Sequence, residues 1–447
     1  MTRRIIVALL RLAMRVYFRR VEVGGSEHVP LKSPAIFVLN HPNALVDPAV
    51  LLCLAPRRVS FLAKAPLFRI PLLGFFVRVM DSLPVYRRQD EGEDVSKNEE
   101  TFVAARKLLA RGGTIGICPE GVSHNEPKLR PIKTGAARIA LAAVSTGEVR
   151  DLRIVPAGLY YTSKTRFRSD ALLYFGKAIE VPVVNLDENA NPPRVEVREL
   201  SARIEEALRN VILAAEHEEA LQTIARAERI FSAEAGGETQ ESLKMELLLQ
   251  QRFLKAYTVL RERVPERLRK LEVRMNRFEE ELKLAGVDPH ELTPPISTLN
   301  ILGHLINRLL LFVVLLPATI IGTVVHYPAY RLGGLLATRF SQDSEDVIST
   351  IKIISAMLLF PLTWLVVFII GYGIAGWFFA LAALVVLPLT GFVAIRFFEE
   401  LDRFVGGLRA LTFFLRRRRF FIRLLAERKA IRGEILALGD EAAHVAG

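Results

Sequence analysis

The stretch from Ile353 to Ile395 contains no charged residue, and this property constrains the fold more than any other part of the sequence. At ~1.5 Å per residue a helix of this length measures ~65 Å, about twice the ~30 Å hydrocarbon core of a bilayer. The stretch must therefore fold back on itself. Gly371 and Gly373 lie near its middle and mark the expected turn. The sequence thus predicts a hairpin of two transmembrane helices over residues 353–395.

A second apolar stretch, Leu309 to Val325, precedes this hairpin and contains Pro317. Lys352 and Arg396 flank the hairpin, so the preference of cations for cytoplasmic loops predicts that both of its ends face the cytoplasm. A third full crossing would then separate the N-terminal part of the chain from the basic run at 416–419. We therefore expect residues 309–325 to be interfacial or re-entrant, with a full span as the alternative.

Composition favours contact with lipid and argues against contact with nucleic acid. Apolar residues make up 51% of the 447 residues, and Lys plus Arg exceed Asp plus Glu by 12. The excess is concentrated in arginines near the two ends, without a base-reading motif, a pattern that suits anionic head groups or the phosphates of a carrier. The only cysteines, Cys53 and Cys118, are far apart and predict neither a disulfide framework nor a cysteine zinc site.

The sequence divides into five parts. The first alternates arginines with apolar residues, which is typical of a helix lying on a membrane surface. In the second, apolar runs at 35–39, 114–118 and 154–158 are separated by helical stretches and predict an α/β domain with a helix-covered, mostly parallel sheet. The predicted parts are a basic amphipathic membrane-associating helix at 1–25, the α/β domain at 26–195, a charged helical region at 196–295, a membrane domain at 296–400 and a basic helical tail at 401–447.

The first candidate site follows the strand predicted at 35–39, where five residues separate His41 from Asp47. A neutral imidazole in such a turn can accept a hydroxyl proton if it is held in one tautomer. A carboxylate on the far ring nitrogen holds that tautomer and stabilises the imidazolium that forms. We therefore predict that His41 is a general base and Asp47 its orienting partner. The alternative is a surface hydrogen-bonded pair without a catalytic role.

Three further blocks lie at or just after predicted strand ends, where α/β domains place ligand sites. They are Leu83-Pro-Val-Tyr-Arg-Arg88, Cys118-Pro-Glu-Gly-Val-Ser123 and Ile154-Val-Pro-Ala-Gly-Leu159. Together with the His41 block, in this order, they resemble the glycerolipid acyltransferase family related to the bacterial lysophosphatidate acyltransferases. That family commonly has four residues between His and Asp. The spacing of five is similar to the fungal-type glycerol-3-phosphate and dihydroxyacetone-phosphate acyltransferases, which also carry membrane helices after the catalytic domain.

The resemblance covers about residues 30–190 and implies that residues 26–195 form an acyltransferase domain. It implies that His41 is the general base and Asp47 its orienter. A guanidinium binds phosphate through two charge-assisted hydrogen bonds, and a glycine lets the backbone approach a ligand closely. Cys118 stands where the family usually has Phe, so we expect a small buried residue rather than a nucleophile. The residues predicted to bind the acceptor are Arg87, Arg88, Glu120, Gly121 and Ser123.

The implied function is that of an O-acyltransferase of phospholipid biosynthesis, with acyl-CoA or acyl carrier protein as donor. The implied acceptor is glycerol-3-phosphate or dihydroxyacetone phosphate, and 1-acyl-sn-glycerol-3-phosphate is the alternative. No cofactor or metal is expected. The expected partners are membrane lipid, the acyl donor and a phosphate-bearing acceptor. The expected location is the inner (cytoplasmic) membrane, with the catalytic domain on its cytoplasmic face.

Two hypotheses from other classes remain. A metal hydrolase would use His41, Asp47, Glu120 and His124, whose spacing matches no zinc signature. A non-enzymatic membrane scaffold would bind anionic lipid through its basic ends, and it predicts that His41→Ala leaves function intact.

Overall fold

The computed structural model describes residues 1–233, 242–292, 298–341 and 344–446. The chain divides into two compact units. The first unit consists of Met1–Ala214 with two short later segments, Ser242–Leu247 and Ala337–Ile353, and the second contains the rest. The boundary predicted at 295–296 lies outside the described residues.

The first unit is built on an eight-stranded sheet with the order β1-β7-β6-β2-β5-β3-β4, and β8 pairs with β6. Neighbouring strands in this order are parallel except for β6 and β7, and β8 is also antiparallel to β6. The prediction of a mostly parallel sheet is therefore confirmed. The strands are β1 (Arg20–Gly24), β2 (Ala35–Leu39), β3 (Ser60–Lys64), β4 (Leu83–Val85), β5 (Thr114–Ile117), β6 (Arg153–Tyr161), β7 (Asp170–Phe175) and β8 (Ile179–Glu180).

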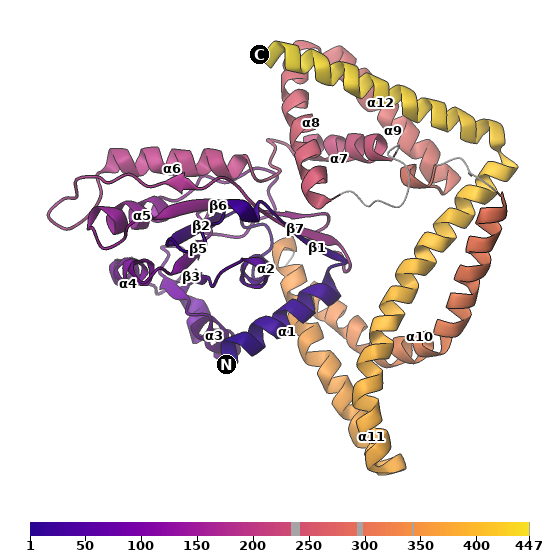
Figure 1. The fold of residues 1–447 in the computed structure, drawn as a ribbon, viewed down its shortest axis with the longest axis horizontal. Helices are drawn as coiled ribbons and strands as arrows, with labels where there is room; N and C mark the ends of the chain where they lie inside the picture. The colour runs from indigo at the N-terminus through magenta and orange to yellow at the C-terminus, as the bar shows by residue number, and fades with distance from the viewer. Residues whose placement is uncertain (234–241, 293–297, 342–343, 447) are drawn as a thin grey trace. The chain divides into compact units, whose positions relative to one another are not determined.

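Helices cover both faces of this sheet (Figure 1). Successive side chains of a strand point to opposite faces. In β2, Phe37 accordingly packs into a core with α1 and α2, whereas Ile36 packs into a second core with α4, α5 and α6. The packed unit continues past residue 195, because Leu200 and Ile204 of α6 are buried in the second core. The helices of this unit are α1 (Thr2–Tyr17), α2 (Val46–Leu54), α3 (Pro71–Val79), α4 (Asn98–Ala110), α5 (Gly135–Ser145) and α6 (Arg194–Arg209), with short 3₁₀ turns at Ser26–His28, Ala65–Arg69 and Val95–Lys97.

The sheet brings three of the sequence blocks to one edge. Strands β5 and β6 flank β2 and are parallel to it. The carboxyl ends of parallel strands lie at the same edge, so the residues that follow them meet there. His41 follows β2, the block starting at Cys118 follows β5, and Tyr161 is the last residue of β6.

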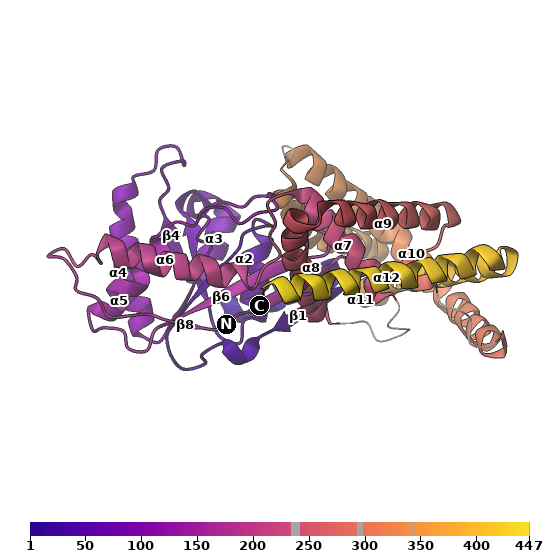
Figure 2. The same cartoon turned by 90° about the horizontal axis from the view of Figure 1, so that it is seen from above.

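Four helices of the second unit supply most of one hydrophobic core, to which Ala410 also belongs (Figure 2). Met275 and Phe278 from α9 pack with Phe421 and Leu424 from α12. Ion pairs reinforce the packing, since Arg274 bonds the carboxylates of two glutamates of α12. The helices are α7 (Glu218–Ser232), α8 (Leu243–Arg263), whose first turn belongs to the first unit, α9 (Pro265–Ala285) and α12 (Arg418–Ala446), with a 3₁₀ turn at Pro289–Glu291.

Among the residues that the structure describes, two helices are long and apolar enough to cross a membrane, α10 (Thr298–Phe340) and α11 (Glu345–Arg416). Their most apolar windows have mean hydropathies of 2.4 and 2.6 and are only 17% and 11% buried. So much exposed apolar surface is untenable in water and suits lipid. The candidate spanning segment of α10, Ile306–Phe340, is longer than the 309–325 stretch predicted. Whether this helix crosses fully or partly stays a prediction.

Within α11 the helix is interrupted at Gly376, where φ is 80° and ψ is −172°. This backbone region is open essentially only to glycine. Figure 1 shows the chain turning back at the foot of α11, and the rings of Phe368 and Trp377 lie 6.0 Å apart across the turn. The predicted hairpin turn therefore exists, but it lies at Gly376 rather than at Gly371–Gly373.

A half-buried histidine joins α10 to both arms of the hairpin. The His326 ring donates through Nδ1 to the Gly322 carbonyl at 2.7 Å and accepts through Nε2 from the Trp364 indole at 2.8 Å. A Cβ added at Gly391 would lie 2.9 Å from this ring, so the second arm packs closely against it. Both ring nitrogens are satisfied, which identifies His326 as a packing residue among apolar helices.

Candidate active site

The His41 side chain lies in hydrogen-bond contact with the Asp47 carboxylate. Nδ1 of His41 is 2.8 Å from Oδ2 of Asp47, which lies in the first turn of α2. The imidazole is 20% exposed and the carboxylate is fully buried. Because Nδ1 faces Asp47, Nε2 is the ring nitrogen left to act on another molecule.

Asp47 is held by two further donors. The Tyr161 hydroxyl donates to Oδ1 at 2.8 Å, and the backbone N–H of Asn43 donates to Oδ2 at 2.7 Å. Burial and the adjacent carboxylate raise the pKa of Tyr161 well above its usual value, so the phenol keeps its proton and donates it. A buried carboxylate with three donors is fixed in position and charge-compensated.

Glu120 fixes the backbone of His41 rather than facing open space. Its carboxylate is buried, accepts the His41 backbone N–H at 3.0 Å and the Arg130 backbone N–H at 3.0 Å, and contacts His124 Nε2. In return, the His124 backbone N–H donates to the His41 carbonyl at 3.1 Å. Both backbone groups of His41 are therefore bonded to the loop that follows β5.

The electrostatic surroundings of His41 favour its protonated form. Burial alone would lower its pKa, but the Cys118 sulfur and the Asp47 carboxylate beside the ring outweigh burial. The pKa of His41 is raised well above its usual value. An imidazole with these partners binds a proton tightly once it has accepted one.

Arg87 and Gly121 lie together beside this pair. Gly121 closes a turn with φ of 76°, and its carbonyl accepts from Arg87 Nη1 at 2.6 Å. The same guanidinium binds Asp90 through Nε at 2.8 Å and Nη2 at 2.6 Å, which lowers the pKa of Asp90. Lys64 and Lys133 lower it further, and a Cβ at Gly121 would come within 2.5 Å of Lys133 Nζ. The turn therefore lies in a predominantly cationic environment.

The remaining predicted residues have different surroundings. The Ser123 hydroxyl bonds the Asp346 carboxylate, and Arg88 is exposed next to Arg87. Cys118 is partly buried against the core that contains β2. The structure thus brings His41, Asp47, Glu120, Gly121 and Arg87 together in one region, and it pairs Ser123 with the start of α11. The predicted roles of these residues stay predictions.

Sequence reasoning missed Tyr161 and the polar residues at the start of α11. Tyr161 follows the fourth block and ends a strand next to β2, which was the available signal. Ser349 and Thr350 follow Asp346 by three and four positions, and all three lie just before the uncharged stretch. That spacing places polar side chains on one helix face.

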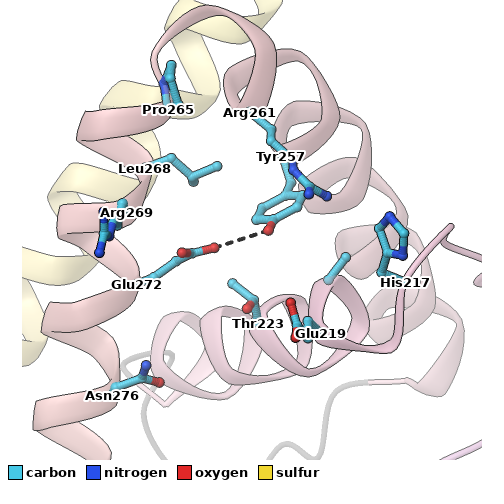
Figure 3. Close-up of a pocket in the computed structure, with 11 residues that line it drawn as sticks. His217, Glu219, Thr223, Tyr257, Arg261, Pro265, Leu268, Arg269, Glu272 and Asn276 are labelled. Atoms are coloured by element: carbon cyan, nitrogen blue, oxygen red, sulfur yellow. Dashed lines mark hydrogen bonds between the residues drawn. The ribbon is translucent and has the colours of Figure 1, made fainter.

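Among the described residues, no group of three or more His, Cys, Asp or Glu side chains is arranged to hold a metal ion. A cavity of about 330 Å³ lies between α7, α8 and α9 of the second unit (Figure 3). Its lining mixes Arg261 and Arg269 with Glu219 and Glu272, and Glu272 accepts from the Tyr257 hydroxyl at 3.1 Å. Mixed charge gives this cavity no preference for an anion or a cation.

Two family models match the chain. The model described as "Acyltransferase" matches residues 20–160, and the model described as "Glycerol-3-phosphate acyltransferase 2 C-terminal domain" matches residues 223–443. The first covers the segments that carry His41, Asp47, Glu120 and Gly121. The second covers most of α7, all of α8 to α11 and nearly all of α12.

Curated relatives agree with these matches. Glycerol-3-phosphate O-acyltransferase 1 of Saccharomyces cerevisiae is 24% identical over 80% of this chain and 59% of its own length. Glycerol-3-phosphate O-acyltransferase 2 of the same yeast is 27% identical over 60% of this chain and 37% of its own length. A 1-acyl-sn-glycerol-3-phosphate acyltransferase of Borreliella burgdorferi is 27% identical over 46% of this chain and 73% of its own length. The chain thus spans between about a third and three fifths of the two yeast proteins.

Proposed function

We propose that this chain, which matches acyltransferase family models over residues 20–160 and 223–443, transfers a fatty acyl group from a thioester to a hydroxyl of a glycerol phosphate. The donor is acyl-CoA or acyl carrier protein, and the acceptor is glycerol-3-phosphate or dihydroxyacetone phosphate. The match to the glycerol-3-phosphate acyltransferase C-terminal domain and the two yeast relatives support this acceptor class. The observation that carries the chemistry is the contact of 2.8 Å between His41 and Asp47.

In the proposed reaction, Nε2 of His41 takes the proton of the acceptor hydroxyl as its oxygen attacks the thioester carbonyl carbon. Asp47 stabilises the imidazolium that forms, and Tyr161 and the Asn43 N–H keep the carboxylate aimed at Nδ1. A carbon–oxygen bond forms, the carbon–sulfur bond breaks, and the departing thiolate takes the proton back from His41. The products are an ester and a free thiol.

The acceptor phosphate binds next to the turn at Gly121. Arg87 and Lys133 supply positive charge there, and the exposed Arg88 adds to it. Glu120 acts from below the turn by fixing the His41 backbone, since its carboxylate is buried and bonded on both oxygens. Phosphate affinity in this arrangement comes from several cations rather than one two-pronged contact, because Asp90 holds two nitrogens of Arg87.

The acceptor is tested by supplying the purified chain with an acyl thioester and equal concentrations of glycerol-3-phosphate, dihydroxyacetone phosphate or 1-acyl-sn-glycerol-3-phosphate. Thiol release and labelled ester are measured for each. We expect kcat/KM for one of the two water-soluble acceptors to exceed that for the lipid acceptor by about tenfold or more, a difference of about 1.4 kcal/mol. A preference for the lipid acceptor would establish the alternative, which the similarity to the Borreliella burgdorferi enzyme favours.

The rate is expected to rise with pH. The base form of His41 is the unprotonated imidazole, and the pKa of His41 is raised above its ordinary value of 6.5. Protonation therefore removes the base at a higher pH than for an unperturbed histidine, and kcat/KM falls on the acid side of that raised pKa. A profile of kcat/KM against pH checks this. A rate that stays constant from well below to well above neutral pH would contradict a general base at this position.

The location that suits this reaction is the inner (cytoplasmic) membrane, with the catalytic unit on the cytoplasmic face, where acyl-CoA and acyl carrier protein are present. Lys352 and Arg396 flank the hairpin and favour cytoplasmic positions for both of its ends. Protease treatment of sealed, right-side-out vesicles is expected to leave the catalytic unit intact. Digestion of the catalytic unit in these vesicles would show that it faces the opposite side of the membrane.

A further inference from the structure

The start of α11 lies against the loops that carry the candidate site. Residues 337–353 belong to the same compact unit as the sheet, although they are more than 200 positions away from His41 in sequence. Thr350 Oγ1 accepts the backbone N–H of Leu45 at 3.2 Å. Leu45 lies between His41 and Asp47 and directly precedes α2. A side chain of α11 thus serves as partner for a backbone donor inside the His41–Asp47 loop.

The conformation of this loop explains why it needs an outside partner. Ala44 has φ of 33°, a value that residues with a Cβ rarely adopt. Such a conformation persists only where the surroundings fix it on both sides. On one side the Asn43 N–H is bound to Asp47, and on the other the Leu45 N–H is bound to Thr350. The five-residue spacing between His41 and Asp47 is therefore accommodated with the help of α11.

A second connection runs through the Lys164 carbonyl. It accepts from Asn43 Nδ2 at 3.4 Å and also from the Ser349 hydroxyl, so it links the same loop to α11. Ser349 is fully buried and also contacts the Tyr17 hydroxyl at 2.7 Å. Lys352 Nζ donates to the next carbonyl, that of Thr165, at 2.7 Å. The connection between β6 and β7 is thereby bonded to two residues of this helical segment.

A third connection holds the loop after β5. The Asp346 carboxylate is buried. Its Oδ2 accepts from the Ser123 hydroxyl, and its Oδ1 accepts from the Ser344 hydroxyl. Ser123 follows Glu120 and Gly121 by only a few residues. Asp346, Thr350 and Ile353 recur at the spacing of one helix face, and Ile353 is buried in the core that contains Phe37 and Val46. One face of α11 thus bonds both site loops and anchors itself in the sheet core.

We infer that Thr350 is a positioning residue of the active site: through the Leu45 N–H it fixes the loop that sets the distance between His41 and the reacting hydroxyl. The inference rests on the proposed function and adds that the C-terminal part of the chain completes the catalytic loop. A base must be held within a fraction of an ångström of its productive position, so loosening this loop lowers the rate of the chemical step. Substrate affinity depends on other residues and changes little.

The test uses the full-length protein in detergent or nanodiscs, with three single variants. Thr350→Val removes the acceptor oxygen at nearly constant volume, Thr350→Ser keeps it, and Thr363→Val is a matched control, because Thr363 bonds only the Leu359 carbonyl of its own helix. We expect Thr350→Val to lower kcat about tenfold or more with KM within about twofold. We expect Thr350→Ser and Thr363→Val to behave as the wild type.

Amide hydrogen exchange over peptides covering residues 40–47 gives a readout that does not require activity. Exchange is expected to rise in Thr350→Val alone, since the Leu45 N–H loses its acceptor. Unchanged exchange, or a kcat equal to the wild type, overturns the inference. If the wild type acylates no glycerol phosphate, the proposed function fails, and exchange alone then decides whether Thr350 holds the loop.

Discussion

Replacing His41 with alanine is expected to lower the rate of acyl transfer by at least ~10²-fold, because removal of a general base typically costs ~10² to ~10⁴. His124, the other imidazole near the turn, bonds the buried Glu120 carboxylate through Nε2, and its side chain is 9% exposed. Membrane association is expected to be unchanged, since α10 and α11 supply the apolar surface. The measurement is thioester release by purified protein, together with the fraction recovered in membranes.

A matched control for this variant is His217→Ala, which removes an exposed imidazole in the second unit. The control is expected to retain the wild-type rate. If His41→Ala also retained it, the general-base mechanism would be refuted and the membrane-scaffold hypothesis would gain support. A loss of activity in both variants would point instead to a general effect on folding, which a thermal melt of each protein detects.

The sequence predicted the central strands well because local signals and tertiary packing agree there. Ala35–Leu39 is apolar throughout and is bounded by polar turns, and it forms β2 with all five residues buried. The helical stretches expected between the apolar runs at 35–39 and 114–118 include α4, which ends just before Gly112, whose φ of 74° suits glycine. In both cases the residue types that favour the element also satisfy its burial, so no long-range information was needed.

The candidate site was less predictable because its contacts join distant residues. The His41–Asp47 contact is local and followed from spacing within one loop. The Tyr161 hydroxyl reaches Asp47 from 114 positions away, and Thr350 reaches Leu45 from 305 positions away. Such pairings depend on strand order and on where the start of α11 packs. Neither is encoded in a local pattern of residue types.

The motif containing Arg87 indicates the type of residue at this position but not which side chains surround it. The motif predicted that the Arg87 guanidinium binds phosphate through two hydrogen bonds. In the structure, two nitrogens of this guanidinium instead donate to the carboxylate of Asp90, three residues later. Asp90 was visible in the sequence at a distance at which turns bring side chains together. The arginine is therefore preorganised by a carboxylate, and a phosphate must compete for it or bind beside it.

The second large effect is expected for Asp47→Asn, which should lower kcat by about 10²- to 10⁴-fold while preserving the shape of the side chain. Asp47 accepts from His41, Tyr161 and the Asn43 N–H. The amide has only one oxygen, and in the place of Oδ2 it still accepts from His41 Nδ1 and the Asn43 N–H, while its NH₂ group faces the Tyr161 hydroxyl. The amide carries no negative charge, so the imidazolium that forms when Nε2 accepts the hydroxyl proton is no longer stabilised.

A shift in pH dependence distinguishes this explanation from simple unfolding. Loss of the carboxylate removes one cause of the raised pKa of His41, so the acid limb of the kcat/KM profile should move to lower pH even as the maximum rate falls. Asp94→Asn is the matched control, because Asp94 is an exposed cap that accepts from Ser96. It should leave both the rate and the profile unchanged. An Asp47→Asn enzyme with an unshifted acid limb would show that Asp47 does not act through His41.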